Sequence, residues 1–134
     1  MLGYNSDKYF ENNIKTASPA QLLLMLYDGA IRFLKIAIDS TNKHDFANAN
    51  KHYQKTQNII QEFIITIDKN APIAKQLVPL YDYFYRQLVQ ANIHKDVAPA
   101  EEVLSYLVEL RETWYQASRQ SPVRLVPKND QYHG

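Results

Sequence analysis

The stretch that decides the fold runs from Thr16 to Thr41 and reads TASPAQLLLMLYDGAIRFLKIAIDST. Its start has the spacing of a capping box, in which Ser18 accepts a hydrogen bond from the backbone three residues on and Gln21 reaches back. Pro19 suits the first helical position, because the N–H that proline lacks would have no partner there. The stretch therefore predicts a long helix that begins at Pro19.

The apolar residues of this helix cover well over half of its circumference at about 100° per residue. They are Leu22, Leu23, Leu24, Leu26, Tyr27, Ala30, Ile31, Phe33, Leu34, Ala37 and Ile38. Only a narrow polar strip remains, formed by Gln21, Asp28, Arg32, Lys35 and Asp39. A helix that is apolar on nearly every side must be buried on nearly every side. We expect it to be the central post of a bundle, with apolar surface left over for another segment or another protein.

Composition bounds the class of protein. The chain has 134 residues, no cysteine, three glycines and a net charge of +1. This length suits one domain with a single core, and the lack of cysteine excludes disulfides, thiolate metal sites and thiol nucleophiles. The opening MLGYNSDKYFENN lacks the basic and apolar regions of a signal peptide, and no apolar run approaches the roughly 20 residues of a membrane span. We expect a soluble, cytoplasmic protein that binds no nucleic acid and inserts in no membrane.

Three further helices are predicted. The second spans about Phe46 to Asp68, with Asp45 as its N-cap, because its apolar residues recur at the three-four spacing of a bundle seam. The third ends near Ile93, but its start is open: either residues 73–77 form a separate turn, or the helix is kinked at Pro79. The fourth opens at Pro99 and ends near residue 121.

These elements predict an all-α fold, an antiparallel up-down-up-down four-helix bundle with short connections. Residues 1–15 are predicted to form a flexible or short-helical arm that covers leftover apolar surface, and residues 122–134 a disordered tail. The bundle itself is expected to span residues 16–121. Trp114 lies on the seam of the fourth helix and is predicted to be a core residue.

The sequence offers little catalytic chemistry. The four histidines are not paired at metal-ligand spacing and lack companion carboxylates; they are His44, His52, His94 and His133. Asp28 and Asp39 are spaced to form ion pairs with Arg32 and Lys35, which indicates a solvated face rather than an acid–base pair. We therefore expect no enzymatic activity, no metal, no cofactor and no small-molecule substrate.

One alternative uses His52. Histidine phosphotransfer domains are also small four-helix bundles, and their phosphorylated histidine is followed three residues later by lysine. His52 and Lys55 have that spacing, although Thr56 stands where those domains carry a small residue. The alternative function is thus a phosphotransfer domain that uses His52.

Several apolar stripes lie away from the predicted seams. Leu24, Ile31 and Ile38 repeat every seven residues beside the polar strip, and the fourth helix carries a second stripe of Leu104, Val108 and Tyr115. Ile65 and Tyr83 also lie off their seams. Contiguous apolar surface usually marks a binding site, but a wide core would explain part of the excess equally well. Gly29, in mid-helix, suggests that another backbone lies close.

The same residues resemble those of a known family, the flagellar secretion chaperone FliS. The first helix carries the opening signature, Thr16-Ala17-Ser18-Pro19, Leu22 and Met25-Leu26-Tyr27-Asp28-Gly29. The later matches are Gln57-Asn58-Ile59-Ile60, Leu80-Tyr81-Asp82-Tyr83, Arg86, Leu88, Ala91-Asn92, Asp96, Glu101-Glu102-Val103, Leu110-Arg111 and Trp114. The resemblance covers roughly residues 4–117. The departures are Pro79, Lys95 and Ala100.

The resemblance implies a cytoplasmic export chaperone without catalytic activity. Such a protein binds the disordered C-terminal segment of flagellin, prevents its premature polymerisation and delivers it to a component of the flagellar type III export gate. The resemblance also implies flagellin contacts by Tyr9, Ile14 and the region that contains Leu22, Leu24, Met25 and Gly29. The apolar stripes add, as further predicted contacts, Ile31, Ile38, Ile65, Tyr83, Leu104, Val108 and Tyr115.

Overall fold

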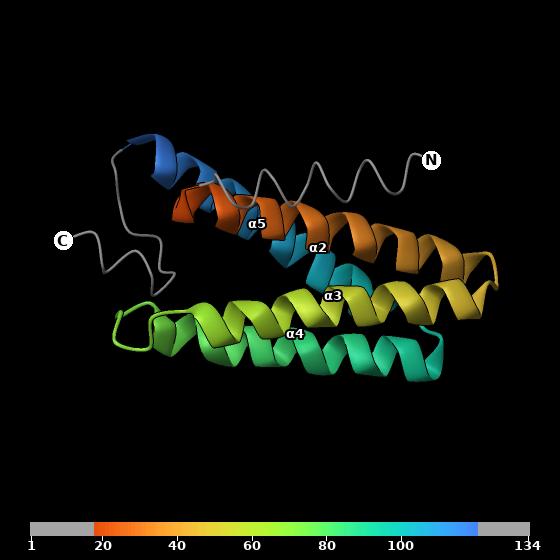
Figure 1. Ribbon diagram of the computed structural model, residues 1–134. Coiled ribbons are helices and arrows are strands. Elements are labelled where there is room, and N and C mark those ends of the chain that lie inside the picture. The colour runs from red at the N-terminus through yellow and green to blue at the C-terminus, as the bar shows by residue number, and fades with distance from the viewer. Residues whose placement is uncertain (1–17, 121–134) are drawn as a thin grey trace.

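The computed structural model describes residues 18–120, so the predicted arm and tail lie outside the described residues. Four helices make up this part of the chain: α2 (Pro19–Asn42), α3 (Phe46–Thr66), α4 (Ala74–His94) and α5 (Ala98–Gln120). Each packs against the next along the chain, and α2 also packs against α5. Figure 1 shows two layers, α2 with α5 and α3 with α4. The predicted antiparallel four-helix bundle is confirmed.

The helix starts follow from the capping residues. The Gln21 backbone N–H donates to Ser18 Oγ at 3.2 Å and the Ser18 N–H donates to Gln21 Oε1 at 2.9 Å, which is the predicted capping box. Asp45 caps α3, since its Oδ1 accepts from the Asn48 N–H at 3.2 Å. Each cap satisfies a backbone donor that the first turn of a helix leaves without a partner.

The start of α4, the third of the predicted helices, decides between the two alternatives. It begins at Ala74 and runs through Pro79 as one element, so residues 73–77 are not a separate turn. The Leu77 N–H donates to the Ile73 carbonyl oxygen at 2.9 Å, which places the first helical bond well before the proline. Pro79 is exposed, so the carbonyl that loses its usual donor lies on the outer side of the bundle.

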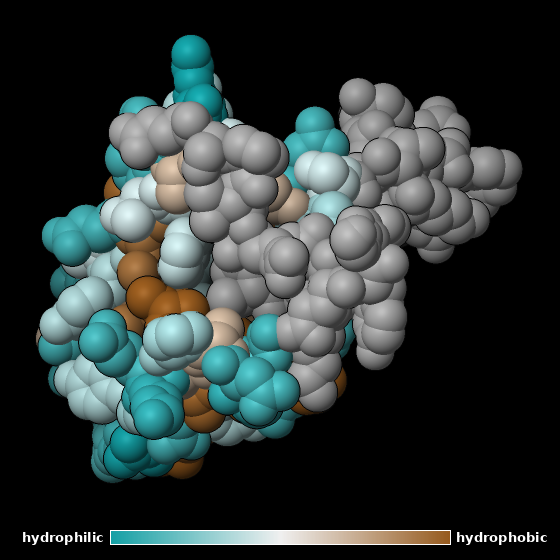
Figure 2. All heavy atoms as spheres, turned by 90° about the vertical axis from the view of Figure 1, so that its left-hand side faces the viewer, coloured by the Kyte–Doolittle hydropathy of each residue, from teal (hydrophilic) through white to brown (hydrophobic). Residues whose placement is uncertain are grey.

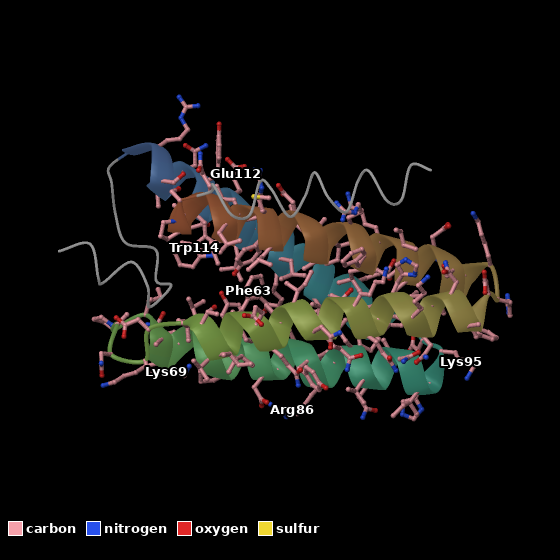
Figure 3. The ribbon with its side chains drawn as sticks, viewed as in Figure 1. Phe63, Lys69, Arg86, Lys95, Glu112 and Trp114 are labelled. Atoms are coloured by element: carbon pink, nitrogen blue, oxygen red, sulfur yellow. The ribbon has the colours of Figure 1, made fainter. Side chains whose placement is uncertain are left out.

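Aromatic side chains fill the core where the two layers meet. The Tyr27 and Phe63 rings stack with their centroids 4.5 Å apart, and Phe63 lies 5.1 Å from Tyr81. Trp114 is 8% exposed, which confirms its predicted core position. Figure 3 shows Trp114 of α5 and Phe63 of α3 lying between the two layers.

Two buried hydroxyls lie inside this cluster and satisfy one another. Tyr27 Oη and Tyr81 Oη are 2.7 Å apart. Burial raises the pKa of Tyr27 to about 12, and contacts with Tyr81 and Trp114 lower it only in part. Burial also raises the pKa of Tyr81. Trp114 Nε1 is buried and makes no hydrogen bond to any residue between 18 and 120.

Candidate binding surface

Within residues 18–120 no group of histidine, aspartate and glutamate side chains is placed to hold a metal ion. No helix in the same range is long and apolar enough to cross a membrane. His52, the residue of the phosphotransfer alternative, is half-buried, and its Nδ1 lies 2.9 Å from the Asn48 carbonyl oxygen.

The polar strip of α2 forms other ion pairs than the sequence suggested. Asp28 pairs with Arg111 of α5, with Arg111 Nε 2.9 Å from Asp28 Oδ1, and Asp39 pairs with Lys43 at 3.0 Å. The predicted partners Arg32 and Lys35 form no ion pair within the described range. Asp28 thus forms an ion pair between α2 and α5 instead of one within its own helix.

The Asp28–Arg111 pair also shows which residues of α2 and α5 lie at the same level. Since the two helices run antiparallel, Leu24 lies level with Tyr115, one turn to one side of the pair. Ile31 lies level with Val108 on the other side. The two stripes that the sequence marked as excess surface therefore lie beside the Asp28–Arg111 pair, at matching levels of α2 and α5.

Most of these stripe residues are not free surface. Leu24, Ile31, Ile38 and Leu104 are partly buried and pack against the core, so the expectation that they form an exposed stripe is wrong. The wide-core alternative therefore holds for these four residues. Val108 alone among the stripe residues counts as exposed, at 46%, while Tyr115 is half-buried between the guanidinium groups of Arg111 and Arg119, 5.3 and 5.7 Å from its ring centroid.

Gly29 is buried on the opposite side of α2, where it faces α3. A Cβ at this position would lie 3.3 Å from Ile59 Cδ1, so the close neighbour is a side chain and not the backbone that we expected. The glycine lets α3 approach α2 closely. A further apolar stripe of α2 lies on the same side of the helix.

This further apolar stripe of α2 is the best candidate for the binding surface of the bundle. Leu22, Met25, Gly29, Phe33 and Ile36 recur every three or four residues, within an arc of about 80°. We call them the α2/α3 face. The four side chains other than Gly29 are half-buried, yet none belongs to the core or to the partly buried set packed on it. They form an apolar strip on the outside of the bundle.

Sequence reasoning found only part of this face. Leu22, Met25 and Gly29 were predicted as contacts, but Phe33 was assigned to the general apolar circumference and Ile36 was passed over. The signal was present in the spacing of the five positions. It was masked because α2 is apolar on so many sides that no single stripe stands out.

The remaining predicted contacts lie elsewhere. Ile65, on the outer side of α3, is 65% exposed. Tyr83 of α4 is half-buried and donates a hydrogen bond to Glu102 Oε1 of α5 at 2.7 Å; this bond raises the pKa of Tyr83. Tyr9 and Ile14 lie outside the described residues. The structure thus gathers Leu22, Met25 and Gly29 on one face and leaves Ile65 and Tyr83 apart from them.

The surface has two other features that could form a binding site. Shallow cavities of about 280 and 270 Å³ lie along α3 and α4; both are lined by Asn92 and Ile93, and otherwise by a mixture of polar and apolar side chains. Figure 2 views the end of the bundle where α2 begins and α3 gives way to α4, and shows hydrophobic residues gathered between hydrophilic ones. Neither feature has a continuous apolar stripe on one helix comparable to the α2/α3 face.

Comparison with known proteins identifies the family. A family model described as flagellar protein FliS matches residues 3–121. The flagellar secretion chaperone FliS of Bacillus subtilis (strain 168) is 39% identical over 109 residues, which cover 81% of this chain and 82% of that protein. The protein of the same name from Salmonella typhimurium is 36% identical over 111 residues, 81% of this chain and 82% of its own, and that of Escherichia coli (strain K12) is 28% identical over 110 residues, 80% and 81%. The chain therefore belongs to the FliS family of flagellar proteins.

Proposed function

We propose that this protein is an export chaperone that binds the disordered C-terminal segment of flagellin, prevents its premature polymerisation and passes it to a component of the flagellar type III export gate. The observation that carries the proposal is the family match across residues 3–121, since the relatives that the chain resembles are named flagellar secretion chaperones. Such a protein acts before export, so we place it in the cytoplasm. Its role is binding and not catalysis.

The α2/α3 face supports the proposal physically. A segment that is disordered alone and folds on binding loses conformational entropy as it docks, so it needs a continuous apolar surface to bury. The half-buried side chains of Leu22, Met25, Phe33 and Ile36 offer such a surface along about four turns of one helix. An amphipathic helix laid on this strip would bury its apolar side against α2.

Calorimetric titration of the full chain with flagellin from the same bacterium tests the proposal. We expect a stoichiometry near one to one and a negative heat-capacity change, because apolar area is buried as the segment folds. Coupled folding that buries 1,000–3,000 Å² corresponds to roughly −0.2 to −0.5 kcal/mol/K. A flagellin that lacks its C-terminal segment is the control, and equally tight binding by this truncated flagellin would refute the proposal.

A further inference from the structure

Two positively charged side chains lie over one aromatic ring of the α2/α3 face. The Arg32 guanidinium carbon lies 5.0 Å from the centroid of the Phe33 ring, and Lys55 Nζ of α3 lies 5.1 Å from the same centroid. Both distances are within the range of cation–π attraction. Because both lie close to the same ring centroid, one cation from α2 and one from α3 are at most about 10 Å apart.

Neither cation has an anionic partner among residues 18–120. The ion pairs of this part of the chain are formed by Lys43, Arg86 and Arg111. Asp28, one turn before Arg32 on the same helix, is held by Arg111 of α5 through two contacts at 2.9 and 3.4 Å. Arg32 and Lys55 thus form a small cationic site that no described carboxylate neutralises.

This site lies directly on the apolar strip. Phe33 belongs to the α2/α3 face, with Gly29 one turn before it and Ile36 one turn after it. The His52 ring lies 6.0 Å from the Phe33 ring, and its Nδ1 is 2.9 Å from the Asn48 carbonyl oxygen, which fixes its orientation. A segment docked along the strip must therefore pass Arg32 and Lys55.

We propose that Arg32 and Lys55 together take an acidic side chain of the docked client segment, and that this contact sets the register of the segment on the α2/α3 face. The inference rests on the proposed function and adds a requirement on the client, a carboxylate beside the apolar residues that cover Phe33. Both side chains are long and exposed, so a carboxylate docked beside the Phe33 ring is within reach of both and would form charge-assisted hydrogen bonds with them. An uncharged client side chain at this level would form no ion pair with either cation.

The test compares two double variants in titrations with the flagellin C-terminal segment at low salt. Arg32→Gln/Lys55→Gln removes the proposed site. The control, Lys35→Gln/Lys51→Gln, removes the same charge from the same two helices at exposed lysines that do not lie over the Phe33 ring. Because both charges are largely exposed, we expect the first variant to bind roughly two- to thirtyfold more weakly and the control to bind within about twofold of the parent protein.

Two further measurements sharpen the result. The conservative variant Arg32→Lys/Lys55→Arg keeps both charges and should bind like the parent protein. The affinity of Arg32→Gln/Lys55→Gln should also fall less with added salt than that of the parent protein, because fewer charges are screened. Thermal unfolding within a few degrees of the parent protein shows that each variant is folded.

Equal affinity of the two double variants would overturn the inference while leaving the proposed function intact. Tighter binding by Arg32→Gln/Lys55→Gln would also overturn it, because the cations would then be holding a segment of the chaperone itself in place of the client. If the parent protein does not bind the flagellin segment, the proposed function fails and this inference fails with it.

Discussion

The buried hydroxyl pair of Tyr27 and Tyr81 allows a quantitative prediction about the core. The two oxygens are 2.7 Å apart and both side chains are almost wholly buried. Changing Tyr27 to Phe removes one hydroxyl and leaves that of Tyr81 without its partner. A buried polar group that loses its hydrogen bond costs about 1–3 kcal/mol, whereas removing both partners is nearly neutral.

We therefore expect Tyr27→Phe and Tyr81→Phe each to lower the unfolding midpoint by roughly 4–12 °C, at about 4 °C per kcal/mol for a domain of this size. The double variant should lie within about 1 kcal/mol of the parent protein. The double-mutant cycle should thus give a coupling of about 1–3 kcal/mol or more.

The pH dependence of stability provides an independent check on the same pair. The pKa of Tyr27 is raised from 10.0 to about 12 in the folded protein. The contribution of the neutral Tyr27 hydroxyl to the free energy of unfolding is therefore fully present below pH 10 and is lost as the pH rises through 12. A rise of about two pKa units corresponds to roughly 3 kcal/mol. Tyr81 acts in the same direction.

Urea unfolding at pH 8, 10, 11 and 12 measures both effects. The parent protein should lose more stability between pH 10 and 12 than Tyr27→Phe/Tyr81→Phe does. Additive single substitutions, together with parallel losses of stability in the two proteins, would refute the reasoning that the hydroxyls are buried and depend on one another.

Three further predictions follow from the packing. Trp114→Ala should cost about 3–5 kcal/mol as a large-to-small change in the core, and loss of client binding at an unchanged unfolding midpoint would contradict this. Gly29→Ala should raise stability by up to about 1 kcal/mol in thermal unfolding, because Ile59 Cδ1 is the free end of a side chain and can move by a few tenths of an ångström; a clear loss would show that Ile59 is fixed. Asp28→Asn should lower the free energy of unfolding by less than about 1 kcal/mol, because the Asp28 side chain is 53% exposed and that of its partner Arg111 is 31% exposed. A loss of stability that persists in high salt would contradict this.

The fold could be predicted from local signals that each have a physical cause. The capping box at Ser18 and the N-cap at Asp45 fixed two helix starts, and the three-four spacing of apolar residues fixed the core. Pro79 was the exception: its position inside α4 could not be read from propensity, because the surrounding seam residues hold the helix together through the proline.

The surface was harder to predict because spacing alone does not distinguish a neighbouring helix from solvent. Leu24, Ile31 and Ile38 have the regularity of an exposed stripe, yet they pack against the core beside α5. Asp28 was assigned to its own helix for the same reason, since its pairing with Arg111 depends on which helices lie side by side. The meeting of Arg32, Phe33 and Lys55 likewise needs the packing of α2 on α3.

The central claim is that the α2/α3 face binds the C-terminal segment of flagellin, and the affinity of two matched variants for that segment tests it most directly. Met25→Asp places a charge on the face, and Ile65→Asp places the same charge on an apolar residue that is 65% exposed on the outer side of α3. With both variants folded, we expect Met25→Asp to bind at least tenfold more weakly than the parent protein and Ile65→Asp to bind like it. Unchanged affinity in Met25→Asp together with a loss of affinity in Ile65→Asp would contradict the claim that the α2/α3 face binds the flagellin segment.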